Sequence, residues 1–493
     1  MSSCFLPIQP FEFSEQEIAE TVRENRLLSM EIEFSQRCNL RCQYCYYADK
    51  TSFENGLTRE EIHDVLLQAK ALGARKIIIL GGEPMVYPHI METLHFLRTE
   101  DLYVEMFTNG YRISPDIAQQ LFDMQVFVVV KMNSRAEHIQ DALSGKKGAY
   151  KNIQEAFKNL LHAGYPGEQP LLAVSSIICQ QNIDDVPAMW EWLRDQNIIP
   201  YFEMITPQGR ARANEWLYVD IGRLEKLFYA LSELDRVKYD IHWEPQPPLV
   251  GIKCQRHQYS CLVNAQGYVF PCVGTNIPVG NIRERKLADI IRESEVIQDL
   301  RNYRKYIKGP CRTCEKLSEC YGCRGAAYQL TGDYLASDPW CWHNANKQND
   351  IVHLPVSADH IIPQKLSMRV IDKLEKVSER MGQASVSISN DMLFVREDGT
   401  LDEAVYLELI AQTIAALNGF KMLGVSDASQ DGYLLGARNL EILGVAGIGD
   451  LLTITVNKVA RYGDFGIVLG QVFRGDEMLA QGEVKIWQKD MES

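Results

Sequence analysis

The sequence predicts an α/β fold of the partial TIM-barrel type, (β/α)6, followed by an irregular cysteine-rich domain and a C-terminal α+β domain. Three observations support this prediction. Strand-like apolar runs alternate with helical segments from about residue 30 to residue 205. Residues 250–345 are rich in Cys, Gly and Pro, so they cannot bury much apolar core. From about residue 363, long alternating strand-like runs accompany a single helix at about 401–417.

The barrel prediction depends on six strand-like runs separated by helical segments. The run KIIIL at 76–80 is typical of a strand that is buried on both faces. The segment 58–72 predicts an amphipathic helix, in which Thr58 and Glu61 form a capping box. Strands that are joined through helices run parallel and curve into a barrel or part of one. The other strands are predicted at 30–34, 102–107, 126–130, 171–178 and 198–205.

Composition limits the classes of function. The 493 residues are 46% hydrophobic and 24% charged, as expected for a globular protein of several domains. The net charge of −14 argues against broad binding to nucleic acid or to anionic membranes. The sequence has no apolar run of about 18 residues and no secretory signal at its N-terminus. We therefore expect a cytoplasmic protein that binds neither nucleic acid nor membrane.

The first cysteine motif has the spacing CxxxCxxC and comprises Cys38, Cys42 and Cys45. It follows the first predicted strand, in the type of loop where such barrels place their chemistry. Three thiolates can hold three irons of a 4Fe–4S cluster and leave the fourth iron open to a small molecule. A structural zinc site would need a fourth ligand nearby, and the closest histidine, His63, lies within the predicted helix. The spacing therefore favours an iron–sulfur cluster.

A second motif follows the second predicted strand and comprises Gly81, Gly82, Glu83 and Pro84. Together with the cysteine motif and its aromatic Tyr44, it resembles the radical S-adenosylmethionine (SAM) superfamily. The resemblance implies that this turn contacts the amino group of the SAM methionine. It implies cleavage of SAM to a 5′-deoxyadenosyl radical, which abstracts hydrogen from a substrate. Further SAM contacts are expected from Asn109 and Lys131, with weaker signals at Ser175, Ser176 and Glu203.

Eight further cysteines lie between residues 254 and 341, enough for two fully ligated 4Fe–4S clusters. Their spacing alone favours a pair of zinc sites, but their order resembles the SPASM extension of radical SAM enzymes. The resemblance implies that one cluster is held by Cys254, Cys261, Cys272 and Cys323. It implies that the other is held by Cys311, Cys314, Cys320 and Cys341. In sulfatase-maturating members an aspartate base follows the third cysteine, whereas Val273 stands here, so formylglycine formation is not expected.

The C-terminal region resembles the hot-dog fold of 3-hydroxyacyl-acyl-carrier-protein dehydratases. The resemblance rests on the segments 363–372, 408–412 and 447–450, with Glu408 at the position of the catalytic acid. Those enzymes also need a histidine, and this sequence has none after His360, so dehydration by that pair is not expected. The resemblance implies a homodimer. The domain would then either hold an acyl or other thioester chain in a tunnel or serve dimerisation alone.

These predictions define four segments and a first hypothesis of function. We expect a radical SAM oxidoreductase or maturase with SAM and three 4Fe–4S clusters, acting on a peptide or on a carrier-tethered acyl or aminoacyl group. Flavodoxin or ferredoxin is the expected electron donor. One alternative is a dehydrogenase or rearrangement enzyme for a small metabolite, and another is a zinc-stapled binding protein without activity. The segments are an N-terminal extension at 1–28, a radical SAM barrel at 29–240, a SPASM domain at 241–350 and a hot-dog domain at 355–493.

Overall fold

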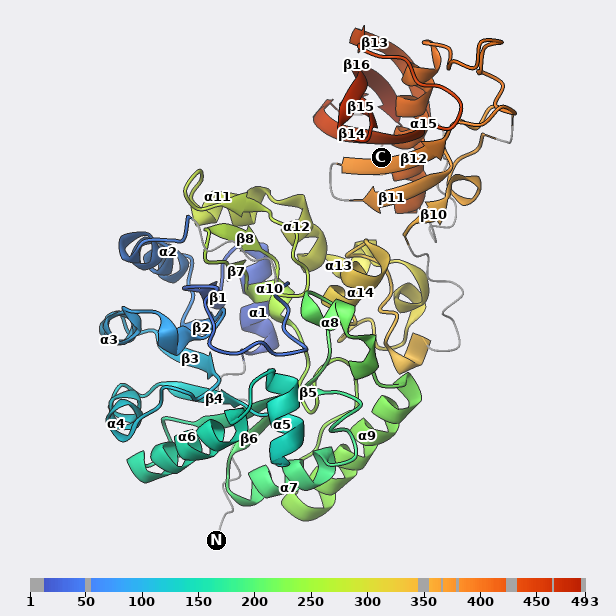
Figure 1. Cartoon of the computed structure of the whole chain (residues 1–493). Coiled ribbons are helices and arrows are strands. Elements are labelled where there is room, and N and C mark those ends of the chain that lie inside the picture. The colour runs from blue at the N-terminus through green and yellow to red at the C-terminus, as the bar shows by residue number, and fades with distance from the viewer. Residues whose placement is uncertain are drawn as a thin grey trace. The chain divides into compact units, whose positions relative to one another are not determined.

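The protein folds into two compact units (Figure 1), seen in a computed structural model. The first unit comprises residues 1–306, 314–329 and 338–348, and the second comprises 307–313, 330–337 and 349–493. The structure describes residues 13–48, 55–344, 354–364, 367–377, 381–422, 432–462 and 465–488. Residue 350, the predicted end of the cysteine-rich domain, and the start of the N-terminal extension lie outside the described residues.

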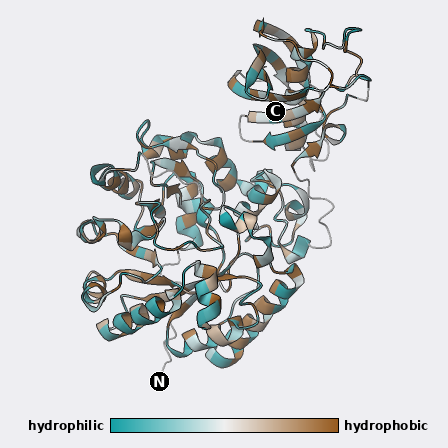
Figure 2. Ribbon diagram, viewed as in Figure 1, coloured by the Kyte–Doolittle hydropathy of each residue, from teal (hydrophilic) through white to brown (hydrophobic). Residues whose placement is uncertain are grey.

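A partial barrel of six parallel strands forms the core of the first unit, which confirms the predicted fold class. Each strand pairs with the next along the chain, because each is followed by at least one helix that returns along the outside of the sheet. Figure 2 shows hydrophobic residues on these strands and hydrophilic residues along the helices. The strands are β1 (Ser29–Glu33), β2 (Lys76–Leu80), β3 (Tyr103–Thr108), β4 (Phe127–Lys131), β5 (Leu172–Ile178) and β6 (Ile199–Met204).

Helices cover the outer side of this sheet (Figure 1). The predicted capping box of Thr58 and Glu61 is present at the start of α2. Sequence analysis missed α1, although Ser14 and Glu17 form a second capping box there. The helices of this part are α1 (Glu15–Arg23), α2 (Arg59–Ala71), α3 (Ile90–Thr99), α4 (Pro115–Asp123), α5 (Glu137–Ser144), α6 (Ala149–Ala163), α7 (Val186–Asp195), α8 (Arg210–Ala213) and α9 (Ile221–Leu234).

The cysteine-rich region extends the same sheet. Strand β7 pairs in parallel with β1, with Leu262 opposite Glu31, and β8 and β9 follow as antiparallel strands. This pairing places the chain after residue 254 directly beside the first barrel strand. The elements are α10 (Arg256–Tyr259), β7 (Leu262–Val263), β8 (Tyr268–Phe270), β9 (Gly280–Asn281), α11 (Leu287–Glu293), α12 (Glu295–Arg301), α13 (Tyr303–Tyr306) and α14 (Arg324–Thr331).

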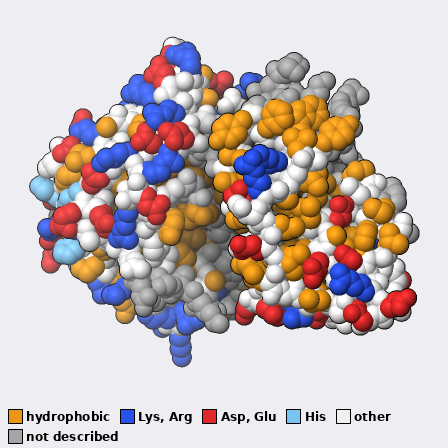
Figure 3. Space-filling model, turned by 90° about the horizontal axis from the view of Figure 1, so that it is seen from above, with side chains coloured by type: hydrophobic (Ala, Val, Ile, Leu, Met, Phe, Trp, Pro, Cys, Tyr) orange, Lys and Arg blue, Asp and Glu red, His pale blue; other side chains and the backbone are white. Residues whose placement is uncertain are grey.

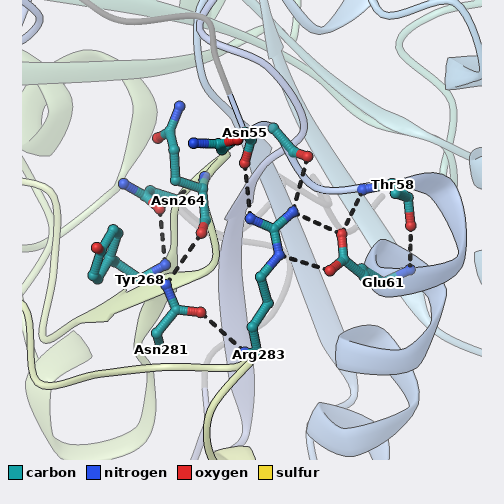
Figure 4. A network of polar contacts seen from close by, with 9 residues as sticks. Asn55, Thr58, Glu61, Asn264, Tyr268, Asn281 and Arg283 are labelled. Atoms are coloured by element: carbon teal, nitrogen blue, oxygen red, sulfur yellow. Dashed lines mark hydrogen bonds and ion pairs between the residues drawn. The ribbon is translucent and has the colours of Figure 1, made fainter.

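Arg283 fastens this extension to the barrel (Figure 4). Its guanidinium donates to both carboxylate oxygens of Glu61, at 2.6 and 2.9 Å, and to the carbonyl oxygens of Asn55 and Gly56, each at 2.9 Å. The Arg283 guanidinium lowers the pKa of the Glu61 carboxyl to about 2. The carboxylate that caps helix α2 is therefore also the anchor of the extension.

We predict that Arg283→Ala lowers the free energy of unfolding of the first unit by about 1 kcal/mol, because four charge-assisted hydrogen bonds are lost at a partly exposed site. Denaturant unfolding checks this, with Arg283→Lys expected to recover only part of the loss because a lysine cannot span both oxygens. Arg292→Ala is the control and should leave the midpoint close to that of the wild type, since Arg292 is exposed and its ion-pair partners lie within its own short helix. An unchanged midpoint for Arg283→Ala would contradict the anchoring role.

The second unit is an antiparallel sheet packed against one long helix, α15 (Val405–Met422). The helix lies close to the sheet at glycines, since a side chain at Gly470 would collide with Ile410. The sheet order is β10-β11-β12-β14-β15-β16-β13. Its strands are β10 (Val356–Ser357), β11 (Lys373–Val377), β12 (Met381–Ser387), β13 (Gly432–Ile442), β14 (Leu451–Tyr462), β15 (Phe465–Arg474) and β16 (Glu477–Gln488).

Several element bounds in the second unit differ from the predictions, and the helix ends at Met422 rather than near residue 417. The helix begins at Val405 rather than near Leu401, because Leu401 forms a bridge with Val395 and Asp402 caps the next residues. Strand β11 is shorter than the predicted run at 367–377. Among the described residues, no helix is both long and apolar enough to span a bilayer.

Candidate active site

The first unit contains a cavity of about 510 Å³, which is within the usual size of ligand sites. Its lining combines the loops after several barrel strands with side chains from the barrel interior. Two groups of cysteines that are far apart in the sequence reach this one cavity. The first group is Cys38, Cys42 and Cys45, and the second is Cys254, Cys272 and Cys323.

The three thiols of the first motif lie near one another after β1. Burial, with a further contribution from the neighbouring Cys45 and Cys38, raises the pKa of the Cys42 thiol to about 12. Partial burial of the thiol raises the pKa of Cys38 to about 11, although the residue as a whole is exposed. Arg210 holds the loop, because its backbone N–H donates to the Cys45 carbonyl at 2.9 Å and its guanidinium to the Cys42 carbonyl at 3.0 Å. The loop thus gathers three soft ligands, a set that fits an iron–sulfur cluster with one open corner.

The glycines after β2 pack against the cysteine loop. Gly81 has φ of +117°, and a side chain there would lie 2.6 Å from the Ser35 carbonyl oxygen. A side chain at Gly82 would collide with the Arg37 carbonyl. Sequence analysis attributed these glycines to close approach of SAM, whereas the structure shows close approach of the loop backbone. Both glycines also line the cavity, so their contact with SAM stays a prediction.

Glu83 fixes the turn to the end of β3. Its carboxylate accepts hydrogen bonds from the Thr108 hydroxyl and the Asn109 N–H, each at 2.6 Å, and from the Met85 N–H at 3.0 Å. Burial raises the pKa of Glu83, and these donors oppose the rise. Glu83 lines the cavity, whereas Pro84 is buried in the short 3-10 helix that follows and is not part of the lining.

The two other predicted SAM contacts, Asn109 and Lys131, also reach the cavity. The Asn109 amide donates to the Asn39 side chain at 2.8 Å, which places it beside the cysteine loop. The Lys131 ammonium lies 3.0 Å from the Ser175 hydroxyl and 5.3 Å from the centre of the Tyr44 ring. Burial lowers the pKa of Lys131. Of the weaker candidates, Ser175 and Glu203 line the cavity and Ser176 does not.

Sequence analysis missed a group of charged side chains inside the barrel. Glu31 pairs with Arg256 at 2.7 Å, and the Arg256 guanidinium also donates to the Tyr201 hydroxyl at 2.9 Å. Lys76 pairs with Glu105 at 3.1 Å, and both are buried. Burial raises the pKa of Glu31, while Arg256 opposes the rise. The sequence did contain a sign of this group, because β1 has a polar residue at every second position (29, 31 and 33). Residues with this spacing point to one face of a strand.

Three of the four cysteines assigned to the first auxiliary cluster lie near one another. Cys254 and Cys272 both raise the pKa of Cys323, although burial of that thiol is the larger cause. Burial raises the pKa of the Cys261 thiol, and the positive charge of the Arg301 guanidinium opposes this rise. Cys261 does not line the cavity, so its place in this set stays a prediction. The second set, Cys311, Cys314, Cys320 and Cys341, also stays a prediction.

Within the described residues, no three His, Cys, Asp or Glu side chains are close enough to bind one metal ion. A 4Fe–4S cluster binds each thiolate through a different iron, so its ligands stand further apart than those of a single ion. The donor set of thiols alone fits such a cluster.

Protein-family models match three successive parts of the chain. Residues 32–193 match the radical SAM superfamily, and residues 254–315 match the SPASM iron–sulfur cluster-binding domain. Residues 356–493 match the ApeP dehydratase family. The chain therefore contains a region that matches the radical SAM superfamily, a region that matches the SPASM domain, and a C-terminal ApeP-like region with the antiparallel sheet and long helix of the hot-dog type. The predicted resemblances are confirmed for all three parts.

Curated relatives match the first two parts of the chain. An AdoMet-dependent heme synthase of Methanosarcina barkeri is 26% identical over 342 residues, which are 64% of this chain and 96% of that protein. A PqqA peptide cyclase of Streptomyces rochei is 28% identical over 63% of this chain and 88% of that protein. A mycofactocin maturase of Mycolicibacterium smegmatis is 24% identical over 66% of this chain and 86% of that protein.

Solved structures share the fold. Streptococcus suis SuiB bound to the precursor peptide SuiA is 16% identical, with a TM-score of 0.51 over 67% of this chain and 82% of that one. The protein anSMEcpe with bound AdoMet is 15% identical, with a TM-score of 0.51 over 65% of this chain and 92% of that one.

Proposed function

We propose that this protein is an oxidoreductase or maturase that uses SAM to abstract hydrogen from a peptide, or from an acyl or aminoacyl group tethered to a carrier, in the cytoplasm. Cys38, Cys42 and Cys45 would hold the cluster that binds SAM. When bound, that cluster would supply the electron that cleaves SAM. The observation that carries the proposal is the single cavity lined by this cysteine group and by Cys254 and Cys272.

The barrel residues would orient the substrate between the two cysteine groups. Paired charges line the interior, so a substrate meets polar partners there without meeting a large net charge. The peptide version is supported by the PqqA peptide cyclase and the mycofactocin maturase among the relatives, and by the fold shared with SuiB. The carrier-tethered version is supported by the ApeP-like domain on the same chain.

Anaerobic reconstitution tests the proposal. We expect about twelve irons and little zinc per chain, together with 5′-deoxyadenosine formation from SAM and a reductant. Incubation with candidate peptides and with acylated carrier proteins then asks which of them raises 5′-deoxyadenosine formation. Two or more zinc ions per chain without cleavage of SAM would instead identify a zinc-stapled binding protein.

A second candidate function is oxidation of a small metabolite. Heme synthases of Methanosarcina barkeri and of a second organism match the chain over about as many residues as the peptide-modifying relatives do. A porphyrin is large, flat and carries carboxylates, and the Lys131 ammonium in the cavity lining could pair with one of them. Binding titrations with an iron porphyrin and with peptides, followed by absorbance and by calorimetry, separate the two candidates.

We also propose that the second unit forms a homodimer through β13. Among the described strands, β13 pairs only with β16, so its outer edge is open. Several large apolar side chains on and after this strand are exposed, and Figure 3 shows a broad hydrophobic area on this unit. A second copy that pairs along the same edge covers that area. The exposed residues include Tyr433, Leu434, Leu435, Leu440, Ile442, Leu443 and Val445.

We predict that Leu435→Arg raises the dissociation constant of the dimer at least tenfold. The arginine charge would be buried against the partner copy. Light scattering and sedimentation velocity across a concentration series measure this. Leu393→Arg is the matched control, since Leu393 is exposed to a similar degree and lies in a loop outside β13. Equal behaviour of the two variants would place the interface elsewhere.

A further inference from the structure

Three loops around the first cysteine motif carry an unusual balance of charge. Residues 35–48, 109–115 and 144–152 contain six cationic side chains and no Asp or Glu, in a chain whose net charge is −14. Lys151, which lies in the first turn of α6, pairs with Glu137 at 3.3 Å. The other five cations form what is here called the basic face: Arg37, Arg41, Arg112, Lys146 and Lys147.

Hydrogen bonds hold the three loops together. The Lys146 ammonium lies 3.3 Å from the Asn39 carbonyl oxygen and 4.5 Å from the centre of the Tyr111 ring. The Arg41 N–H donates to the Ser144 carbonyl at 3.2 Å. The loops therefore form one surface next to the cysteine motif, although they are far apart in the sequence.

The basic face is accessible and few acids offset it. Arg37, Arg41, Arg112 and Lys147 are exposed, and Cys38, between the first two, is the most exposed thiol of its motif. Asp141 lies nearby, where its carboxylate accepts the N–H groups of Gly148 and Tyr150 at 2.6 and 2.8 Å. Asp116 lies in the first turn of α4, just beyond the second loop. Positive charge concentrated on an acidic protein attracts an acidic partner and raises its association rate.

We propose that the basic face is the docking surface for an acidic one-electron carrier of the flavodoxin type. This inference rests on the proposed function. The site favours an electron carrier because electron transfer falls steeply with distance, and this surface surrounds the loop of Cys38, Cys42 and Cys45.

The electron balance of the step is simple. The reduced flavin carrier loses one electron and passes to its one-electron-oxidised state. An iron–sulfur group held by the three thiolates of Cys38, Cys42 and Cys45 would accept that electron, and no covalent bond would form or break during the transfer. The five cations take part only by holding the carrier against the loop, so they are positioning residues.

The test compares two double variants of the reconstituted full chain. Arg112→Glu with Lys147→Glu reverses two charges of the basic face. Lys158→Glu with Lys226→Glu makes the same change of net charge at exposed positions of α6 and α9. An acidic flavodoxin in its reduced form is the macromolecular reductant, and dithionite is the small one. Stopped-flow absorbance gives the rate of reduction, and calorimetry gives the flavodoxin affinity with and without metal in the protein.

For the face variant we expect reduction by flavodoxin to slow about tenfold at low salt, with a weaker salt dependence and a weaker affinity. Reduction by dithionite and the behaviour of the control variant should match the wild type. Equal flavodoxin rates for the two variants overturn the proposal. Loss of affinity for an acidic acyl carrier protein, with an unchanged flavodoxin rate, overturns it in favour of substrate delivery. A wild-type protein that dithionite cannot reduce refutes the proposed function itself, and with it this proposal.

Discussion

Replacing Cys42 with alanine is expected to remove about four irons per chain and to bring 5′-deoxyadenosine formation below detection. Its thiol is the central one of the first motif, and its pKa responds to both Cys38 and Cys45. With two thiolates left, the cluster loses one of its three protein ligands, so SAM has no iron to bind. Iron and sulfide analysis, paired with a SAM cleavage assay, measures both effects.

The matched control is Cys179→Ala. Cys179 is buried, lies after β5 among apolar residues and belongs to neither cysteine group. Its replacement should leave the iron content and the cleavage of SAM unchanged. If Cys42→Ala keeps a full complement of iron and cleaves SAM, then the three thiolates do not form the SAM-binding cluster, and the proposed function is wrong.

Asp235→Ala should destabilise the first unit by about 3–5 kcal/mol, the largest stability effect that we expect from one side chain. Asp235 is fully buried and accepts four hydrogen bonds. They come from the indole N–H groups of Trp190 and Trp243, at 2.8 and 2.9 Å, and from Arg194, at 3.1 and 2.8 Å. The variant leaves a buried guanidinium and two indole donors without a partner. Denaturant unfolding, followed by tryptophan fluorescence and by circular dichroism, measures the loss.

A surface ion pair on the same stretch of chain provides the control. Glu233 pairs with Arg236 at 2.6 Å, and both side chains are more than half exposed. Glu233→Ala should therefore unfold close to the wild type, because water replaces the lost partner. If Asp235→Ala behaves like Glu233→Ala, the buried network does not contribute to the stability of the barrel. Asp235→Asn gives an intermediate case, since it keeps the shape and one acceptor oxygen.

Local chemistry in the sequence was enough to predict most of the fold. The six strands appeared within one or two residues of their predicted positions, because continuous apolar runs such as 76–80 have few alternatives to a buried strand. The capping box at Thr58 marked the start of α2 correctly for the same local reason. The same kind of local signal, a capping box of Ser14 and Glu17, also marks the start of α1, which was not predicted.

Contacts between distant segments could not be predicted in this way. The pairing of β7 with β1 joins residues more than 200 positions apart, and it places Arg256 beside Glu31 inside the barrel. No local pattern encodes that ion pair, because each partner alone resembles an ordinary polar residue. The role of Gly81 and Gly82 was likewise predicted as contact with a ligand. In the structure these glycines pack closely on the backbone of the cysteine loop, which is a tertiary contact.

The sequence by itself determined the class of chemistry, because the spacing of Cys38, Cys42 and Cys45 and the turn at 81–84 are short-range features that only a few ligands fit. Only the tertiary structure decided what surrounds that chemistry. The tertiary structure places a second group of cysteines at the same cavity and ion pairs inside the barrel. It also places five cations beside the first cysteine motif. Such arrangements depend on how strands and loops pack in three dimensions, and the energy of that packing is spread over contacts that no single segment contains.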